Sequence, residues 1–495
     1  MRSRHRANLA RADKPEWGIV SQPHAKIVII GGGPGGYEAA LVAAQLGADV
    51  TVVDSDGLGG ACVLTDCVPS KTLIATSGMM SALDGAAALG LRPDPGTGPG
   101  AGPAPHGAVL ATVDAPRLYS RVKALARAQS ADVAQRLAAE GVEVVTGAGR
   151  LTGPRTVAVG DTELSADVVL VATGARPRVL PGVMPDGERI LTCRQLYDLD
   201  ELPPELIVIG SGVTGAEFAS AYQALGSQVT LVSSRGRVLP QHDADAAMVI
   251  EEVSLRRGMT VLGRSRAVSA RRDGDGVVVA LEDGRILQGS HCLLTVGMVP
   301  NTGGLGLDEA GITLDKGGFI PVDRVSRTPV PGVYAAGDCT GVQMLASVAA
   351  MQGRIAMWHS LGDAVQPLHL SHVAMTVFTE PEIASVGVSQ QAVEAGAADA
   401  LAVNLPLATN ARAKMQGFRD GFVKLFARPR SGTVVGGVVV APRASELILA
   451  VSLAVEQMLT VDQIAHTFAV YPSLSGSLTE AARRLMRPVG DGAEI

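Results

Sequence analysis

The sequence predicts an α/β protein that contains two similar strand–turn–helix–strand units. The first unit is KIVIIGGGPGGYEAALVAAQLGADVTVVDSD (26–56), and the second is LIVIGSGVTGAEFASAYQALGSQVTLVSSRGRVLP (206–240). In each, a short β-branched strand runs into a glycine-rich turn, an amphipathic helix and a second strand. This pattern is typical of a Rossmann-like dinucleotide-binding domain, so the chain is expected to bind two dinucleotides.

In the first unit, three glycines have mechanical roles. Gly31 allows the tight turn, Gly33 allows the backbone to approach a pyrophosphate, and Gly36 allows close packing of helix on strand. Asp54 ends the second strand, where a carboxylate can accept both hydroxyls of an adenosine ribose.

The second unit has the corresponding glycines but no acid at the end of its second strand. The glycines are Gly210, Gly212 and Gly215, and the strand is followed by Ser233, Ser234, Arg235 and Arg237. An acid would repel a 2′-phosphate, whereas hydroxyls and guanidinium groups can bind one. The sequence therefore favours NADPH at this unit, with NADH remaining an alternative.

Composition limits the class of protein. The 495 residues are 47% hydrophobic and carry a formal net charge of -6, so there is ample core and no basic surface for nucleic acid. We expect residues 1–24 to be a disordered basic tail and the Pro/Gly-rich residues 92–107 to be a surface insertion. The apolar run 446–459 contains Glu456 and is too short to span a membrane, so a buried helix is expected and no integral membrane segment.

The chain has five cysteines, at positions 62, 67, 193, 292 and 339. An odd, sparse set suits a reducing compartment, so a cytoplasmic protein is expected. No further cysteine or histidine near Cys62 and Cys67 completes a zinc site, and His369 and His372 lack a third ligand. No metal site is expected, and the other three cysteines are expected to be small buried residues.

The spacing of Cys62 and Cys67 favours a reactive pair. A regular helix separates residues five apart by a rise of about 7.5 Å, whereas a disulfide needs Cα atoms within about 4.4–6.8 Å. The chain between them must therefore turn irregularly, and Pro69 fits a helix that is just beginning. A helix N-terminus and Lys71 favour a thiolate here, while Asp66 opposes it.

Several motifs resemble those of the flavoprotein disulfide reductases, the family of lipoamide dehydrogenase, glutathione reductase and mercuric reductase. GGACVLTDCVPSK (59–71) resembles the redox-active cysteine motif of that family. ATGARP (172–177), VGMVPN (296–301) and AAGDCTG (335–341) resemble its later signatures, and the resemblance runs from about residue 25 to 487.

The resemblance implies FAD at the first unit and a pyridine nucleotide, NADPH or NADH, at the second. FAD would contact Gly31, Gly33, Gly36, Asp54, Lys71, Gly149, Thr173, Gly174, Asp338 and Ala346. NADPH or NADH would contact Gly210, Gly212, Gly215, Ser233, Arg235, Arg237 and Gly297. Lys71 would lie near the flavin and pair with Glu217, Cys67 would face the flavin, and Cys62 would exchange with a disulfide substrate.

The resemblance also implies a domain order and a homodimer. An FAD-binding domain over 25–180 and 300–368 would be interrupted by an NAD(P)-binding domain over 181–299, and an α+β dimerisation domain would follow over 369–495. Each active site of such a dimer would use residues from the last domain of the partner.

The chain departs from this family at YPSLSG (471–476). Where the family has an acid–base histidine oriented by a glutamate, this chain has Tyr471 and Gly476, and His466 lies in a different place. A phenol with an ordinary pKa of about 10 is a poor base near neutrality, although it can donate a hydrogen bond. Loss of general acid–base assistance typically lowers a rate by roughly 10² to 10⁴.

The pattern is therefore closest to the NAD(P)H quinone reductase branch of the family. Such an enzyme passes electrons through FAD to a quinone-type acceptor and needs no proton exchange with thiols. We expect the catalytic residues to be Cys62, Cys67, Lys71, Glu217 and Tyr471. Two alternatives remain, a disulfide reductase with a displaced catalytic base and a flavin-bearing redox sensor.

Overall fold

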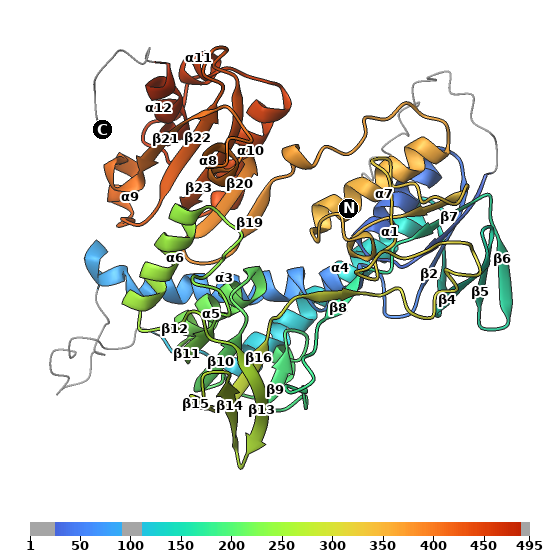
Figure 1. Cartoon of the computed structure of the whole chain (residues 1–495), viewed down its shortest axis with the longest axis horizontal. Helices are drawn as coiled ribbons and strands as arrows, with labels where there is room; N and C mark the ends of the chain where they lie inside the picture. The colour runs from blue at the N-terminus through green and yellow to red at the C-terminus, as the bar shows by residue number, and fades with distance from the viewer. Residues whose placement is uncertain (1–24, 92–110, 487–495) are drawn as a thin grey trace, which may run out of the picture.

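The computed structural model of the chain describes residues 25–91 and 111–486, and Figure 1 shows its three parts. The expected tail at 1–24 and the expected insertion at 92–107 lie outside these residues. Within the described ranges, none of the helices combines the length and apolar character needed to cross a bilayer. The same ranges hold no cluster of three or more His, Cys, Asp or Glu residues that suits a metal ion.

The first part is a five-stranded parallel sheet built around the first glycine-rich unit. Strand β1 (Lys26–Ile30) lies at its centre because its β-branched side chains are buried on both faces. The spatial order is β18 (Val333–Ala335), β7 (Val168–Val171), β1, β2 (Asp49–Asp54) and β3 (Glu143–Thr146). Helices α1 (Pro34–Gln45) and α7 (Ala346–Ser360) pack against each other beside it. An antiparallel sheet is inserted, formed by β4 (Gly149–Gly153), β5 (Thr156–Val159) and β6 (Thr162–Ser165).

The second part repeats this topology around the second unit. Its parallel sheet has the order β12 (Thr260–Leu262), β11 (Gln228–Val232), β10 (Glu205–Ile209), β16 (His291–Leu294) and β9 (Ile190–Thr192). Its helices are α5 (Val213–Leu225) and α6 (Ala244–Arg256). Its antiparallel insertion is β13 (Ala267–Asp273), β14 (Gly276–Leu281) and β15 (Ile286–Gly289). The short pair β8 (Ala175–Pro177) and β17 (Met298–Pro300) joins the two parts.

The third part is an antiparallel sheet covered by helices. Its strands, in spatial order, are β19 (Met375–Val377), β20 (Glu382–Gly387), β23 (Val434–Ala441), β22 (Phe422–Ala427) and β21 (Leu401–Pro406). Its helices are α8 (Gln390–Glu394), α9 (Ala411–Met415), α10 (Ala444–Glu456), α11 (Val461–Ala465) and α12 (Gly476–Leu485). The predicted fold class, two Rossmann-like domains followed by an α+β domain, is therefore confirmed.

The remaining helices and 3-10 turns lie between these elements in the sequence. They are α2 (Gly60–Leu64), α3 (Cys67–Asp84), α4 (Ala115–Ala139) and the short 3-10 turns η1 (Ala86–Leu89), η2 (Leu196–Asp198), η3 (Asp338–Thr340), η4 (Leu370–His372) and η5 (Leu407–Thr409). In Figure 1, α3 runs from the first part across the second, where it packs on α5.

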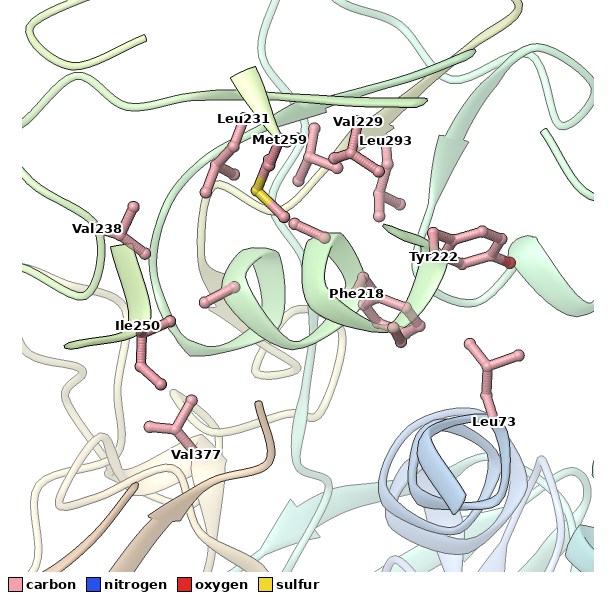
Figure 2. Close-up of a cluster of buried hydrophobic side chains, with 14 of the residues drawn as sticks. Leu73, Phe218, Tyr222, Val229, Leu231, Val238, Ile250, Met259, Leu293 and Val377 are labelled. Carbon is pink, nitrogen blue, oxygen red and sulfur yellow. The ribbon is translucent and has the colours of Figure 1, made fainter. Parts of the chain in front are cut away.

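One hydrophobic cluster joins α3 and α4 to the second and third parts. Figure 2 shows Leu73 of α3 near Phe218 and Tyr222 of α5, with Val377 of β19 at the other end of the same cluster. All four side chains are at most 1% exposed. Because this cluster holds residues of α3 and α4 together with residues of the second and third parts, we infer that burial of apolar surface fixes these two helices against both parts.

Helix α10 differs from its expected buried state. Ile448 and Val451 are buried against the sheet, but Leu449 and Leu453 are 61% and 53% exposed. One face of the helix is therefore buried and the other is exposed, although both faces are apolar. Leu449 and Leu453 leave an apolar face of α10 exposed on the single chain.

Candidate functional site

A cavity of about 870 Å³ opens at the carboxyl ends of the strands of the first sheet. Parallel α/β sheets bind their ligands at this edge. Cys62 and Cys67 of the cysteine motif line the cavity, together with residues of the turns that follow the strands. The expected FAD contacts that line it are Gly31, Gly33, Asp54, Gly149, Thr173, Gly174, Asp338 and Ala346.

The glycine turn brings the start of α1 directly against β1. A Cβ atom added at Gly36 would lie 1.8 Å from the carbonyl oxygen of Gly31, which has φ +107°. Gly36 therefore does not line the cavity but permits the turn that shapes it. The N-terminus of α1 has no capping side chain and no acid in its first turn. Its free backbone N–H groups can therefore bind a phosphate.

Asp54 stabilises the same turn. Its carboxylate accepts hydrogen bonds from the backbone N–H groups of Gly32 at 2.6 Å, Asp56 at 2.9 Å and Gly57 at 2.5 Å. A carboxylate has about four lone-pair sites, so Asp54 can hold the loop and still accept a bond from a ligand in the cavity that it lines.

Cys62 and Cys67 lie at a break between two helices, as their spacing predicted. Helix α2 ends at Leu64, and α3 begins at Cys67, with Asp66 in a non-helical conformation between them. Both cysteines are free thiols here. The hydrogen bond between them lowers the pKa of Cys67, and the charge of Lys71 acts in the same direction, while burial and Asp66 oppose it. That bond and burial raise the pKa of Cys62.

Lys71 and Glu217 form an ion pair at 2.9 Å that joins the first two parts of the chain. The other Glu217 oxygen accepts the backbone N–H of Phe378 at 2.9 Å, and the Lys71 ammonium lies 4.9 Å from the centroid of the Phe378 ring. The Glu217 side chain is 4% exposed. Burial opposes the charge of Lys71, but Glu217 outweighs it and raises the lysine pKa. All three parts therefore meet beside Cys67.

The second unit reproduces the turn of the first. Gly210 has φ +113°, and a Cβ atom added at Gly215 would lie 1.9 Å from the Gly210 carbonyl oxygen. Thr295, in the motif after β16, donates its hydroxyl to the carbonyls of Ile209 and Gly210 at 3.0 Å each. Gly297 follows with φ +99°. The geometry is that of a second dinucleotide site.

Two family models match most of the chain. Residues 25–353 match the pyridine nucleotide-disulphide oxidoreductase model, and residues 373–482 match the dimerisation domain of the same family. The chain belongs to the pyridine nucleotide-disulphide oxidoreductase family.

Relatives and solved structures agree with this assignment. An NAD(P)H dehydrogenase (quinone) of Mycobacterium tuberculosis is 56% identical over 475 residues, which are 93% of this chain and 94% of the relative. A dihydrolipoyl dehydrogenase of Zymomonas mobilis is 34% identical over 92% of this chain and 97% of its own length. The crystal structure of LpdA from Mycobacterium tuberculosis is 55% identical, with a TM-score of 0.87 over 94% of this chain and all of that one.

Members of this oxidoreductase family use FAD and NAD(P)H, and the two sites of this chain fit these cofactors. The large cavity beside the cysteine pair has the glycine turn, the free helix N-terminus and two carboxylates, Asp54 and Asp338, for the polar parts of FAD. Burial and the charge of Asp66 raise the pKa of Asp338 to about 6. The turn of the second unit would hold NAD(P)H.

The three residues after β11 that were expected to contact the pyridine nucleotide lie in different environments. Ser233 is fully buried, its hydroxyl is hydrogen-bonded to that of Ser211 at 2.7 Å, and it accepts the backbone N–H of Arg235 at 3.2 Å. This placement argues against the direct phosphate contact that we expected from Ser233. The Arg237 guanidinium contacts the carbonyls of Pro240 and His242 at 3.4 Å, whereas Arg235 is exposed.

Tyr471 and Gly476 belong to the third part of the chain and lie outside the cavity that contains the cysteine pair. Tyr471 is 85% exposed on a loop that also exposes Phe468 and Val470, and Gly476 begins α12. Tyr471 does not line the cavity of its own chain. His466, also exposed, contacts Asp462 on its own helix. The sequence-based view that His466 does not replace the missing histidine stays a prediction.

Sequence reasoning missed several residues of the site. Phe378 and the cavity-lining Arg194 carry no motif. Outside the cavity, the sequence indicated an ordinary histidine at His372, but its Nδ1 lies 2.6 Å from a carboxylate oxygen of Glu456. These two residues are 84 positions apart, so only the fold brings them together.

Removing the Cys62 thiol should reduce the reactivity of Cys67. In Cys62→Ala the lost S–H donor raises the pKa of Cys67, so less thiolate exists at a given pH below that pKa. A hydrogen bond to a charged group is worth about 1.5–3 kcal/mol, so alkylation of Cys67 in the reduced holoprotein should slow roughly 10-fold or more. Mass spectrometry of iodoacetamide-treated protein over a pH series measures this rate at each cysteine.

Asp66→Asn is the control, because it should change the pKa of Cys67 in the opposite direction to Cys62→Ala. It removes a nearby negative charge that opposes the Cys67 thiolate, so the pH profile should move to lower pH. If both variants moved the profile in the same direction, the two thiols would not interact as described.

Proposed function

We propose that this protein is an NAD(P)H dehydrogenase that uses a quinone as its electron acceptor. The proposal rests mainly on the missing acid–base pair. Tyr471 and Gly476 stand where the family has a histidine and a glutamate. A quinone does not need the proton exchange with thiols that such a pair provides. The name of the 56% identical relative, NAD(P)H dehydrogenase (quinone), supports the same acceptor.

The residues of this chain would bind and position the reactants. Bound in the cavity, FAD would supply the redox chemistry that carries an electron pair from NAD(P)H to the acceptor. The glycine turns and helix N-termini would hold the two dinucleotides in place. The Lys71–Glu217 pair fixes α3 against α5 and keeps a positive charge beside Cys67.

The proposal predicts that the holoprotein reduces a benzoquinone faster than lipoamide or glutathione disulfide by roughly 10² to 10⁴, the usual contribution of a general acid–base group. Cys62→Ser should leave the quinone rate largely unchanged and abolish any disulfide reduction. Steady-state oxidation of NADPH with each acceptor measures both. Equal or faster turnover of a disulfide would refute the quinone assignment.

A second candidate function is disulfide reduction with a displaced base. The hydrogen-bonded Cys62–Cys67 pair favours it, and it rests on a redox-active disulfide that the two thiols would form. The His372–Glu456 pair supplies a histidine–carboxylate couple in the third part of the chain. If this function were correct, His372→Gln would lower disulfide turnover and leave quinone turnover unchanged.

We also propose that the protein is a homodimer. The dimerisation-domain match covers the exposed apolar side chains of the third part, which include Leu449, Leu453, Phe468, Val470 and Tyr471. An exposed apolar set of this kind is typical of an interface. Sedimentation velocity should give one species of twice the chain mass, and a monomer would contradict the proposal.

The domain division is a further proposal. The first sheet takes its strands from within 25–180 and 300–368, and the second from within 181–299. These memberships support the expected boundaries, with a dimerisation domain over 369–495. The odd, sparse set of five cysteines supports a reducing compartment, and we propose the cytoplasm.

A further inference from the structure

The end of β11 is where a second nucleotide-binding strand usually contacts the adenosine ribose. In this chain the strand ends at Val232, and the buried Ser233 hydroxyl fixes the following loop instead of facing a ligand. The loop therefore presents Ser234 and Arg235 to solvent. No carboxylate stands at the position that would bind the 2′-hydroxyl of NADH.

A second arginine lies beside this loop. The backbone N–H of Arg264, which follows β12, donates to the carbonyl of Arg235 at 2.7 Å. A Cβ atom added at Gly236 would lie 3.7 Å from Nε of Arg264, so its guanidinium faces the loop. Arg264 has φ +51°, a left-handed conformation that is uncommon for a residue with a side chain and is enriched at ligand sites.

In the described part of the chain, Arg235 and Arg264, like Arg237, lack the acidic partners that the arginines of the adjacent hairpin have. Within the residues that the structure describes, neither guanidinium has a carboxylate oxygen within 4.0 Å. Four nearby arginines do have one: Arg266 with Glu282, Arg271 with Asp273, Arg272 with Glu188 and Arg285 with Asp283. Two exposed guanidinium groups held on adjacent loops without acids repel each other, and a dianion would relieve that repulsion.

We propose that Arg235 and Arg264, with the Ser234 hydroxyl, bind the 2′-phosphate of NADPH and so select it over NADH. Arg237, whose guanidinium is directed to the carbonyls of Pro240 and His242, shapes the loop. This inference rests on the proposed function and deepens it by naming the nucleotide.

The test compares how NADPH and NADH reduce the bound flavin. Arg264→Gln and Arg235→Gln should each weaken NADPH binding roughly 10-fold or more, the value of a charge-assisted hydrogen bond, and leave NADH binding unchanged. Anaerobic stopped-flow measurement of flavin bleaching against nucleotide concentration gives both dissociation constants. Arg266→Gln, in the same loop but paired with Glu282, is the matched control and should change neither.

Adenosine 2′,5′-bisphosphate and AMP give an independent readout. The first should compete with NADPH in the wild type far better than AMP does, and Arg264→Gln should remove that difference. Equal losses for NADPH and NADH, or no loss for NADPH, would overturn the proposal. Because flavin bleaching precedes any acceptor, this result does not depend on whether a quinone or a disulfide is reduced afterwards.

Discussion

Replacing Gly36 by alanine should leave the purified protein without FAD, whereas replacing Gly215 by alanine should leave FAD bound but prevent its reduction by NAD(P)H. The added Cβ would lie 1.8 Å from the Gly31 oxygen in the first case and 1.9 Å from the Gly210 oxygen in the second. The same steric conflict therefore arises in two separate sites.

The conflict cannot be relieved by rotating a side chain, because both contacted atoms are backbone carbonyl oxygens in the turns that approach the dinucleotides. Overpacking of a close contact costs about 1–3 kcal/mol. Since the turn and the binding site are the same atoms, we expect a loss near the upper end, roughly 100-fold in affinity for the corresponding dinucleotide.

Flavin content and flavin bleaching separate the two variants. The visible absorbance of the purified protein should be lost in Gly36→Ala and kept in Gly215→Ala, which dithionite but not NADPH should bleach. Gly78→Ala, in the middle of α3 with no atom within 4 Å of the added Cβ, is the control and should keep both properties. A Gly215→Ala protein that lost its flavin would show that the two units are not independent.

The glycine turns could be predicted from sequence because their chemistry is local. The first turn is determined by six consecutive positions, from Gly31 to Gly36. The β-branched strand before it, β1, is buried on both faces, as expected for a strand at the centre of a parallel sheet. The irregular turn between Cys62 and Cys67 followed in the same way from spacing and from Pro69. The contact that requires glycine at position 36 is with the carbonyl of Gly31, which lies in the same short stretch of sequence.

Other parts of the site could not be predicted because they depend on long-range contacts. Glu217 was placed by resemblance to a family, but nothing local indicated that its second oxygen accepts the Phe378 N–H, 161 positions away. Ser233 and Arg237 were given the same role as Arg235, and only the fold shows that the first is buried and the second is directed into the loop. Arg264 follows β12, whereas Arg235 follows β11. No spacing in the sequence therefore indicates that the two residues are in contact.

Replacing Lys424 by methionine should lower the free energy of unfolding by about 3–5 kcal/mol, the usual effect of removing one partner of a buried ion pair. The Lys424 ammonium, on β22 of the third part, contacts Asp243 at 2.8 Å and Asp245 at 2.7 Å at the start of α6 in the second. Lys424 and Asp243 are only 3% and 4% exposed. Methionine fills similar volume but leaves the Asp243 charge buried without its counter-ion.

Two comparisons show whether the loss comes from the uncompensated charge. Lys123 pairs with Asp198 at 2.8 Å, but these side chains are 43% and 66% exposed, so Lys123→Met should cost less than about 1 kcal/mol. Adding Asp243→Asn to Lys424→Met should restore much of the stability, because asparagine removes the charge and can still accept the N–H groups of Asp245 and Ala246 at the start of α6. Urea denaturation at one protein concentration, which holds any dimer equilibrium constant, measures all four proteins. If the double variant were no more stable than Lys424→Met, the loss would come from packing around Lys424, and the contact between α6 and β22 would be held together by shape and not by charge.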